Sequence, residues 1–158
     1  YIIPTFFTAT NVTPYCYEAL FKNCFLNDIP VGLLPVMELE EGCYKEMFSN
    51  NGGLGKTLKA GVLPATTLAP YCYEGMFSFT NILEIEANAL PATDLAIGCY
   101  KDMFYVNRYM TTLPDNLLPA ETLATSCYSS MFYGCTSLVN APVLPAAEID
   151  LHSYDGMF

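Results

Sequence analysis

A short motif repeats six times along the chain, and this repeat constrains the fold more than any other feature. A Cys-Tyr pair is followed two residues later by Met-Phe, and successive copies lie 27, 29, 27, 28 and 26 residues apart. The first copy has Leu20-Phe21 in place of Met-Phe. The six copies of the Cys position are Cys16, Cys43, Cys72, Cys99, Cys127 and Ser153. A period between about 20 and 50 residues indicates stacked units that share one core.

All variation in length falls in one part of the repeat. A Leu-Pro pair, with its proline eight residues before the Cys position, opens every copy except the first. From this leucine to the third residue after Met-Phe the spacing is 17 in each complete copy, for example from 63 to 80. The remaining segment spans 10, 12, 10, 11 and 9 positions. We therefore expect a constant scaffold that carries variable surface segments.

The longest variable segment contains "NNGGLGKT" at 50–57, which resembles a phosphate-binding loop. Such a loop needs a glycine five residues before its Gly-Lys pair, and that position is Asn50. Pro64 follows too soon for the helix that the loop requires. We interpret the stretch as an insertion in the repeat, and we predict that the chain binds no nucleotide and no other cofactor.

The spacing of apolar residues predicts a short helix in each constant segment. In "LPATTLAPYCYEGMF", these residues follow an i, i+4, i+5, i+8, i+9 pattern, which is typical of one helix face. They are Leu68, Cys72, Tyr73, Met76 and Phe77. The variable segments, such as "TSLVNAPVLP" at 136–145, predict a brief strand or extended turn.

The full pattern "LPATTLAxxCYxxMFxGCTSLxxAPxLP", carried most completely by 118–145, resembles BspA-like leucine-rich repeats. These repeats occur in surface proteins of host-associated anaerobic bacteria. The resemblance implies an α/β fold, a right-handed leucine-rich-repeat solenoid of about six 26–29-residue repeats, with short strands on one side and short helices on the other. It also implies that residues 1–158 form a single domain of a longer array. Two departures are the length of the repeat and the missing Leu-Pro of the first copy.

Composition excludes several classes of partner. Six basic against sixteen acidic residues give a formal charge of −10, which disfavours nucleic acid and anionic membrane surfaces. Hydrophobic residues make up 53% and charged residues 14%, so we expect a packed fold. No apolar run approaches the roughly 20 residues that span a bilayer, so we expect no membrane insertion.

Two columns of the repeat contain cysteine. The column that begins at Cys16 suggests either a disulfide ladder or free buried thiols, and we favour free thiols because equivalent side chains point the same way. The second column holds Cys24, Asn51, Thr80, Asn107 and Cys135. Short polar side chains at one register favour a structural column that satisfies backbone groups of buried turns.

Other conspicuous residues have ordinary interpretations. The Tyr and Met-Phe columns are better explained as core than as an aromatic platform for a ligand. His152 is the only histidine and lacks the spacing of a zinc ligand. Glu38, Glu40 and Glu41 lack the surrounding sequence of a calcium loop and favour a solvated turn. We therefore predict no metal site and no catalytic residues.

The resemblance implies a function in non-enzymatic recognition or adhesion, extracellular or at a cell surface, and we predict a host protein or a glycan as ligand. The alternative is a structural spacer, fibre or virion-surface component without a ligand of its own. Binding residues are expected where the copies differ. The candidates are Lys56, Lys59, Glu84, Glu86, Asn88, Arg108, Tyr109, Thr112 and Asn140. The apolar ends "YIIPTFF" and "YDGMF" predict that further repeats or another chain cover them.

Overall fold

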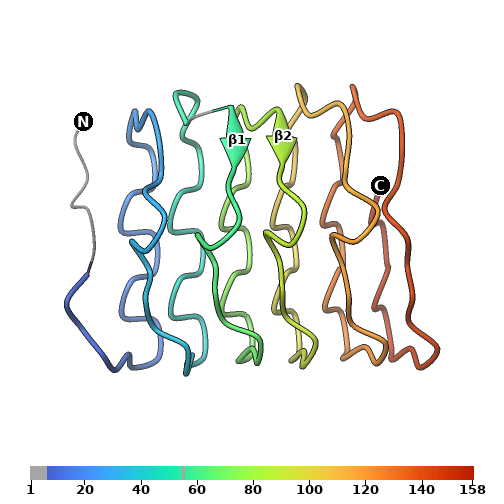
Figure 1. Ribbon diagram of the computed structural model, residues 1–158, viewed down its shortest axis with the longest axis horizontal. Helices are drawn as coiled ribbons and strands as arrows, with labels where there is room; N and C mark the ends of the chain where they lie inside the picture. Colours follow the sequence, from blue (N-terminus) through green and yellow to red (C-terminus); the bar gives the residue numbers. More distant parts are fainter. Residues whose placement is uncertain (1–6, 55) are drawn as a thin grey trace.

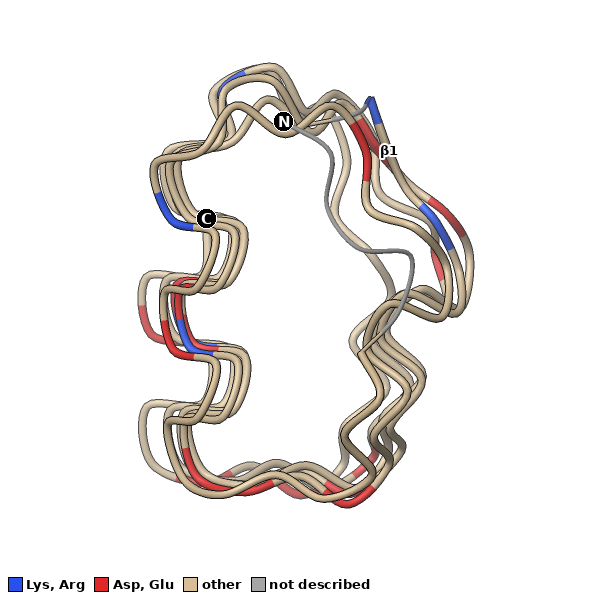
Figure 2. Ribbon diagram, turned by 90° about the vertical axis from the view of Figure 1, so that its left-hand side faces the viewer, with Lys and Arg blue, Asp and Glu red and all other residues tan. Residues whose placement is uncertain are grey.

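Each sequence copy winds into one coil, and the coils stack side by side along the long axis of the molecule (Figure 1). The computed structural model describes residues 7–54 and 56–158. Seen along the stack, each coil has one stepped side and an opposite side that carries the short strands (Figure 2). Residues 1–6, which include most of the apolar start of the chain, and Gly55 of the Gly-Lys-Thr stretch lie outside the described residues.

The expected α/β leucine-rich-repeat solenoid of strands and helices is wrong. Across 7–54 and 56–158 there is no helix, and hence none with the length and apolar character to cross a membrane. The two strands of this part of the chain are β1 (Thr57–Leu58) and β2 (Glu84–Ile85), which pair in parallel with Thr57 opposite Glu84. The variable segments thus form brief strands in two coils, but the predicted helices are replaced by turns.

The stepped side of the stack, which we call the turn wall, uses two alternating sets of backbone hydrogen bonds. In the fourth coil the N–H groups of Lys101 and Met103 donate to carbonyls three residues earlier, at 3.1 and 3.2 Å. The N–H groups of Tyr100 and Asp102 donate instead to carbonyls of the fifth coil, at 3.0 and 2.9 Å. Every second peptide therefore joins neighbouring coils. The turn wall comprises residues 15–23, 42–50, 71–79, 98–106, 126–134 and 152–158.

This alternation places a left-handed backbone at every fourth residue. φ is +58° at Gly98, +54° at Asp102 and +59° at Val106. A residue other than glycine loses roughly 1–2 kcal/mol in this region. The turns bury large apolar side chains in return, and each contributes about 1.5–3 kcal/mol. Burial therefore outweighs the strain in the fourth coil, where Asp102 and Val106 are the two such residues.

The side chains of the turn wall point inward in pairs with a period of four residues. In the fourth coil 99–100 and 103–104 are buried, whereas 101–102 and 105–106 are partly exposed. A period of four lies close to the 3.6 residues of an α-helix, and for this reason the apolar spacing looked helical. In an α-helix every N–H group donates to the carbonyl four residues earlier, whereas here every second N–H group donates to the next coil.

Two columns of stacked rings explain why a helix has no room here. Ring centroids of successive coils lie 6.1 Å apart for Tyr44 and Tyr73, and 5.5 Å apart for Phe104 and Phe132. Neighbouring helices need about 8–10 Å between their axes, so coils this close cannot each contain a helix. One column is Phe7, Tyr17, Tyr44, Tyr73, Tyr100, Tyr128 and Tyr154. The other is Phe21, Phe48, Phe77, Phe104, Phe132 and Phe158.

The buried side chains form one core cluster that runs through the stack. The prediction that the Tyr and Met-Phe columns are core is confirmed for the second to fifth copies, where Phe48, Phe77 and Phe104 are 0% exposed and Phe132 is 1% exposed. The first copy differs, because Cys16 is exposed and its tyrosine is only partly buried.

The polar column inside the wall satisfies turn carbonyls, as the sequence predicts. The side-chain amide of Asn107 donates to two carbonyls at 2.7 and 3.0 Å, and its oxygen accepts from Thr80 at 2.6 Å. Asn51 donates to equivalent carbonyls at 2.7 and 2.9 Å. The thiols of Cys135 and Cys24 make longer contacts with carbonyls, at 3.3 and 3.8 Å.

The ring column predicts a large loss of stability when one ring is removed. Phe77→Ala should lower the free energy of unfolding by about 3–5 kcal/mol, because it deletes a fully buried ring between two others. Tyr109→Ala, at a tyrosine that is 60% exposed, should change it by less than about 0.5 kcal/mol. Urea unfolding followed by tyrosine fluorescence measures both values. Equal losses in the two variants would contradict the ring column as the core.

Candidate functional site

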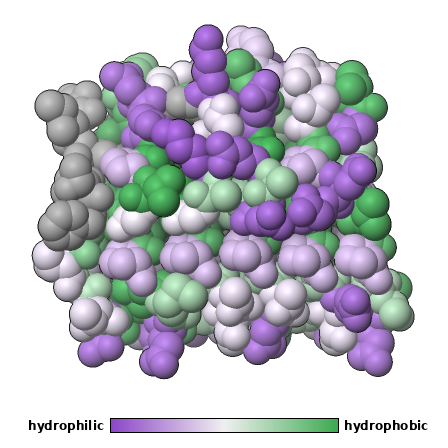
Figure 3. Space-filling model, in the orientation of Figure 1, coloured by the Kyte–Doolittle hydropathy of each residue, from purple (hydrophilic) through white to green (hydrophobic). Residues whose placement is uncertain are grey.

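Four of the predicted ligand-binding side chains lie together around the two strands. Lys56, Glu84, Lys59 and Glu86 lie in or beside β1 and β2, on the face where hydrophilic side chains gather (Figure 3). The Nζ atom of Lys59 lies 2.8 Å from the carboxylate of Asp28, and Glu86 accepts a backbone N–H at 2.8 Å. Lys59 and Glu86 therefore link neighbouring coils.

The remaining predicted residues are spread along the variable side. Asn140 both accepts from and donates to the backbone of the preceding coil, at 2.9 and 2.8 Å, so its side chain has a structural role. Asn88 accepts a side-chain hydrogen bond from the next coil at 3.0 Å. Arg108, Tyr109 and Thr112 are exposed. Ligand binding by this face stays a prediction.

All seven cysteines are free thiols, and most are unreactive by environment. Burial raises the pKa of Cys43 and Cys127 to about 11 and that of Cys99 to about 12. Cys16 is exposed, unlike the rest of its column. Within 7–54 and 56–158 no group of three or more His, Cys, Asp or Glu side chains is placed to hold a metal ion. The five buried thiols, those of Cys43, Cys72, Cys99, Cys127 and Cys135, therefore act as small core side chains.

The raised thiol pKa values predict selective alkylation of the native protein. At pH 8 iodoacetamide should modify the exposed Cys16 quickly and Cys43, Cys99 and Cys127 only after unfolding, because these three are buried and the thiolate is the nucleophile. Mass spectrometry counts the modified sites. Fast modification of Cys99 in the folded protein would contradict its burial.

The same thiols predict a loss of stability in alkali. Since the folded pKa of Cys43 and Cys99 is raised above the ordinary value of 9.0, to about 11 and about 12, the stabilising effect is complete below pH 9 and is lost as pH rises through the folded values. The midpoint of urea unfolding should fall over this range. Replacing Cys99 by Ala should make the fall shallower, and an unchanged slope would contradict the assignment.

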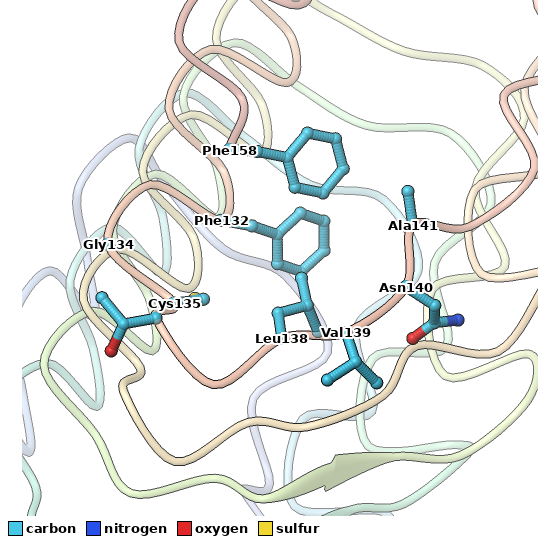
Figure 4. A pocket seen from close by; sticks show the side chains of 9 residues that line it. Phe132, Gly134, Cys135, Leu138, Val139, Asn140, Ala141 and Phe158 are labelled. Atoms are coloured by element: carbon cyan, nitrogen blue, oxygen red, sulfur yellow. The ribbon is translucent and has the colours of Figure 1, made fainter.

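A hollow of about 450 Å³ lies at the last coil (Figure 4). Phe132, Leu138, Val139 and Phe158 line it, and no charged side chain does. Its Asn140 side chain already bonds the backbone of the preceding coil. This hollow offers apolar surface but little that would select a ligand.

A second hollow, on the outer surface of the turn wall, combines charged and aromatic groups. Its volume is about 340 Å³, and it spans the second, third and fourth coils. Acidic and basic residues are interspersed along this wall (Figure 2). The hollow is lined by Glu46, Glu74, Gly75, Ser78, Phe79, Asp102 and Tyr105. We treat it as the candidate site, because charged groups and aromatic rings converge in its lining.

In the hollow a glycine separates two carboxylates of one column of the wall. Glu46, Gly75 and Asp102 occupy the same outward position in three successive coils. We call the space over Gly75, between the two carboxylates, the Gly75 slot. A Cβ atom on Gly75 would lie 3.2 Å from Cγ of Glu46, and the φ of +60° also favours glycine. A larger residue at this position would fill the slot.

The lysines around the slot are already paired. Nζ of Lys45 lies 2.7 Å from the carboxylate of Glu74, and Nζ of Lys101 lies 3.6 Å from its other oxygen. Lys22 pairs with Glu46. The charges of these two glutamates are therefore balanced within the chain.

Asp102 differs from its neighbours. It is partly buried and makes no ion pair or side-chain hydrogen bond with any residue of 7–54 and 56–158. Burial raises the pKa of Asp102, and the nearby charges of Glu74 and Glu46 raise it further. The charges of Lys101 and Lys45 lower this pKa but do not cancel the increase. Its ionised form thus loses hydration without gaining a partner, which leaves a carboxylate that a cation would stabilise.

Aromatic rings form one border of the slot. Phe79 and Tyr105 have centroids 5.5 Å apart and an interplanar angle of 61°, so their faces do not cover each other. Tyr105 and Tyr133 are 5.3 Å apart and nearly parallel at 13°. The hydroxyl of Ser78 is occupied, since it bonds Ser49 and a backbone carbonyl, both at 2.9 Å. The free groups of the slot are therefore a carboxylate and a phenyl ring.

The pKa of Asp102 predicts that its removal does not destabilise the fold. Because the folded pKa is raised, the ionised side chain lowers stability above its ordinary pKa and has no effect when protonated in acid. Asp102→Asn should therefore be at least as stable as the unmodified protein at neutral pH, and the difference should vanish on acidification. Asp94→Asn, at an exposed aspartate, is the matched control. Urea unfolding across pH measures both, and a large loss in Asp102→Asn would contradict this picture.

Sequence analysis missed this site because it assigned the constant segment to helices and core. One signal was present: the column of Glu18, Lys45, Glu74 and Lys101 alternates in charge from copy to copy. Such alternation indicates side chains that pair across neighbouring coils on an exposed face.

Comparisons with known proteins identify no relative. No protein-family model matches the chain, and no curated protein or solved structure matches it significantly.

Proposed function

We propose that this chain is a non-enzymatic recognition module whose Gly75 slot binds a basic side chain of a protein partner. The observation that carries the proposal is the carboxylate of Asp102, which is partly buried, lacks an ion pair within the described chain and borders an exposed phenyl ring. A cation that enters the slot gains both a charge partner and a ring.

The charge of the chain and of the slot favours a basic protein over a neutral glycan as the partner, because the lining includes the carboxylate of Asp102. The formal charge of −10 also favours a basic partner, which it would attract over a distance. We keep the resemblance to BspA-like surface proteins, and with it an extracellular or cell-surface location, as predictions.

The alternative function is a structural spacer. The regular hydrogen bonds between coils favour it, since they repeat along the whole wall and describe a stiff element. A spacer needs no unpaired, partly buried carboxylate, and for this reason we prefer recognition.

A basic peptide tests the proposal directly. A fluorescent peptide with lysine and arginine between glycines should bind the chain, and the same peptide with glutamine at each basic position should not. Asp102→Asn should weaken binding roughly tenfold, because it removes the charge partner. Asp94→Asn should leave it unchanged. Fluorescence anisotropy measures the affinities.

Acidification gives a second readout of the same site. Since the pKa of Asp102 is raised, binding should weaken at a higher pH than protonation of an ordinary aspartate would require. Binding of the glutamine peptide with equal affinity, or unchanged binding by Asp102→Asn, would overturn the proposal and favour the spacer.

A further inference from the structure

The ions that already surround the Gly75 slot limit what can enter it. Ammonium groups of the chain occupy the other carboxylates, since Lys45 and Lys101 contact Glu74 and Lys22 contacts Glu46. The carboxylate of Asp102 keeps both oxygens free of donors from the described residues. The slot therefore offers two adjacent acceptors on one group.

Two acceptors on one carboxylate match a guanidinium better than an ammonium. A guanidinium presents two parallel N–H groups in a fixed plane, whereas an ammonium is a compact, strongly hydrated point charge. The hydroxyl of Ser78 is occupied, so it does not replace the water that an ammonium would lose. The weaker hydration of the guanidinium lowers this cost.

The ring beside the slot adds a second requirement. Phe79 is 51% exposed, and its interplanar angle of 61° with Tyr105 leaves a face uncovered by that ring. A planar guanidinium can lie flat on this face while its edge donates two parallel hydrogen bonds to the carboxylate, whereas an ammonium has neither a flat face nor two parallel donors.

From this geometry we propose that the group recognised in the Gly75 slot is the guanidinium of an arginine side chain on the partner, held by the carboxylate of Asp102 and stacked on Phe79. This rests on the proposed function and narrows it to one residue type. Arginine should bind roughly tenfold more tightly than lysine, because it makes two charge-assisted hydrogen bonds and a stacking contact.

The test uses small probes on the intact chain. N-acetyl-arginine methylamide, its lysine counterpart and its uncharged citrulline counterpart are titrated at millimolar concentration, with the amide signals of residues 74–79 and 101–105 followed by NMR. We expect saturable shifts with the arginine probe, much weaker binding of the lysine probe and none with citrulline.

Variants separate the parts of the site. Asp102→Asn should abolish the shifts, and Phe79→Leu should remove the preference for arginine while leaving weak binding of both cations. Gly75→Asn fills the slot with a residue that tolerates its backbone and should also block binding. Asp94→Asn is the control that should bind normally. The spectrum of each variant without ligand shows whether the variant is folded. If Gly75→Asn does not fold, Asp102→Asn still tests the proposal.

Each outcome has a distinct meaning. Equal binding of arginine and lysine that is lost in Asp102→Asn overturns the guanidinium proposal and leaves the proposed function intact. Arginine binding that survives in Asp102→Asn overturns the proposed site. Absence of shifts with either cation overturns both proposals.

Discussion

The close approach of successive coils in the turn wall is the constraint on which the rest of the structure depends. Stacked rings hold equivalent residues at centroid distances such as 5.7 Å for Phe48 and Phe77, and every second peptide donates to the next coil. Coils at this spacing cannot contain helices. The backbone therefore turns back at every fourth residue, and it accepts left-handed φ values at side chains such as Asp102 and Val106.

Because the turn wall repeats from coil to coil, a distinct binding surface can arise only where the residue type within a column changes. Gly98 is covered by the ring of Tyr71, since a Cβ atom there would lie 2.5 Å from that ring. Gly42 is covered in the same way by Tyr15, at 2.3 Å. At Gly75 a Cβ atom would instead meet Cγ of Glu46 at 3.2 Å and Oγ of Ser78 at 3.7 Å, and no ring lies that close. Glycine thus makes room for a tyrosine ring at Gly42 and Gly98, whereas at Gly75 it forms part of the candidate site.

Much of the scaffold could be predicted from the sequence, because each column has one environment repeated in every coil. The buried rings and the polar column with Asn51 and Asn107 follow from residue type at fixed register, and the structure places them as expected. The helices could not be rejected, since a period of four residues differs little from 3.6 over one short segment. A helix and these turns differ in the carbonyl to which every second N–H group donates, and in the turns that carbonyl lies in another coil.

The sequence by itself determined that six copies stack, which columns are core and where the length varies. These properties are local to one copy and so appear in its pattern. The tertiary structure decided the spacing of the coils and the convergence of Glu46, Gly75 and Asp102. It also decided that no helix forms within residues 7–54 and 56–158. These three residues lie 29 and 27 positions apart in the chain. Whether their side chains pair or remain free depends on lysines from neighbouring coils, which only stacking brings into contact.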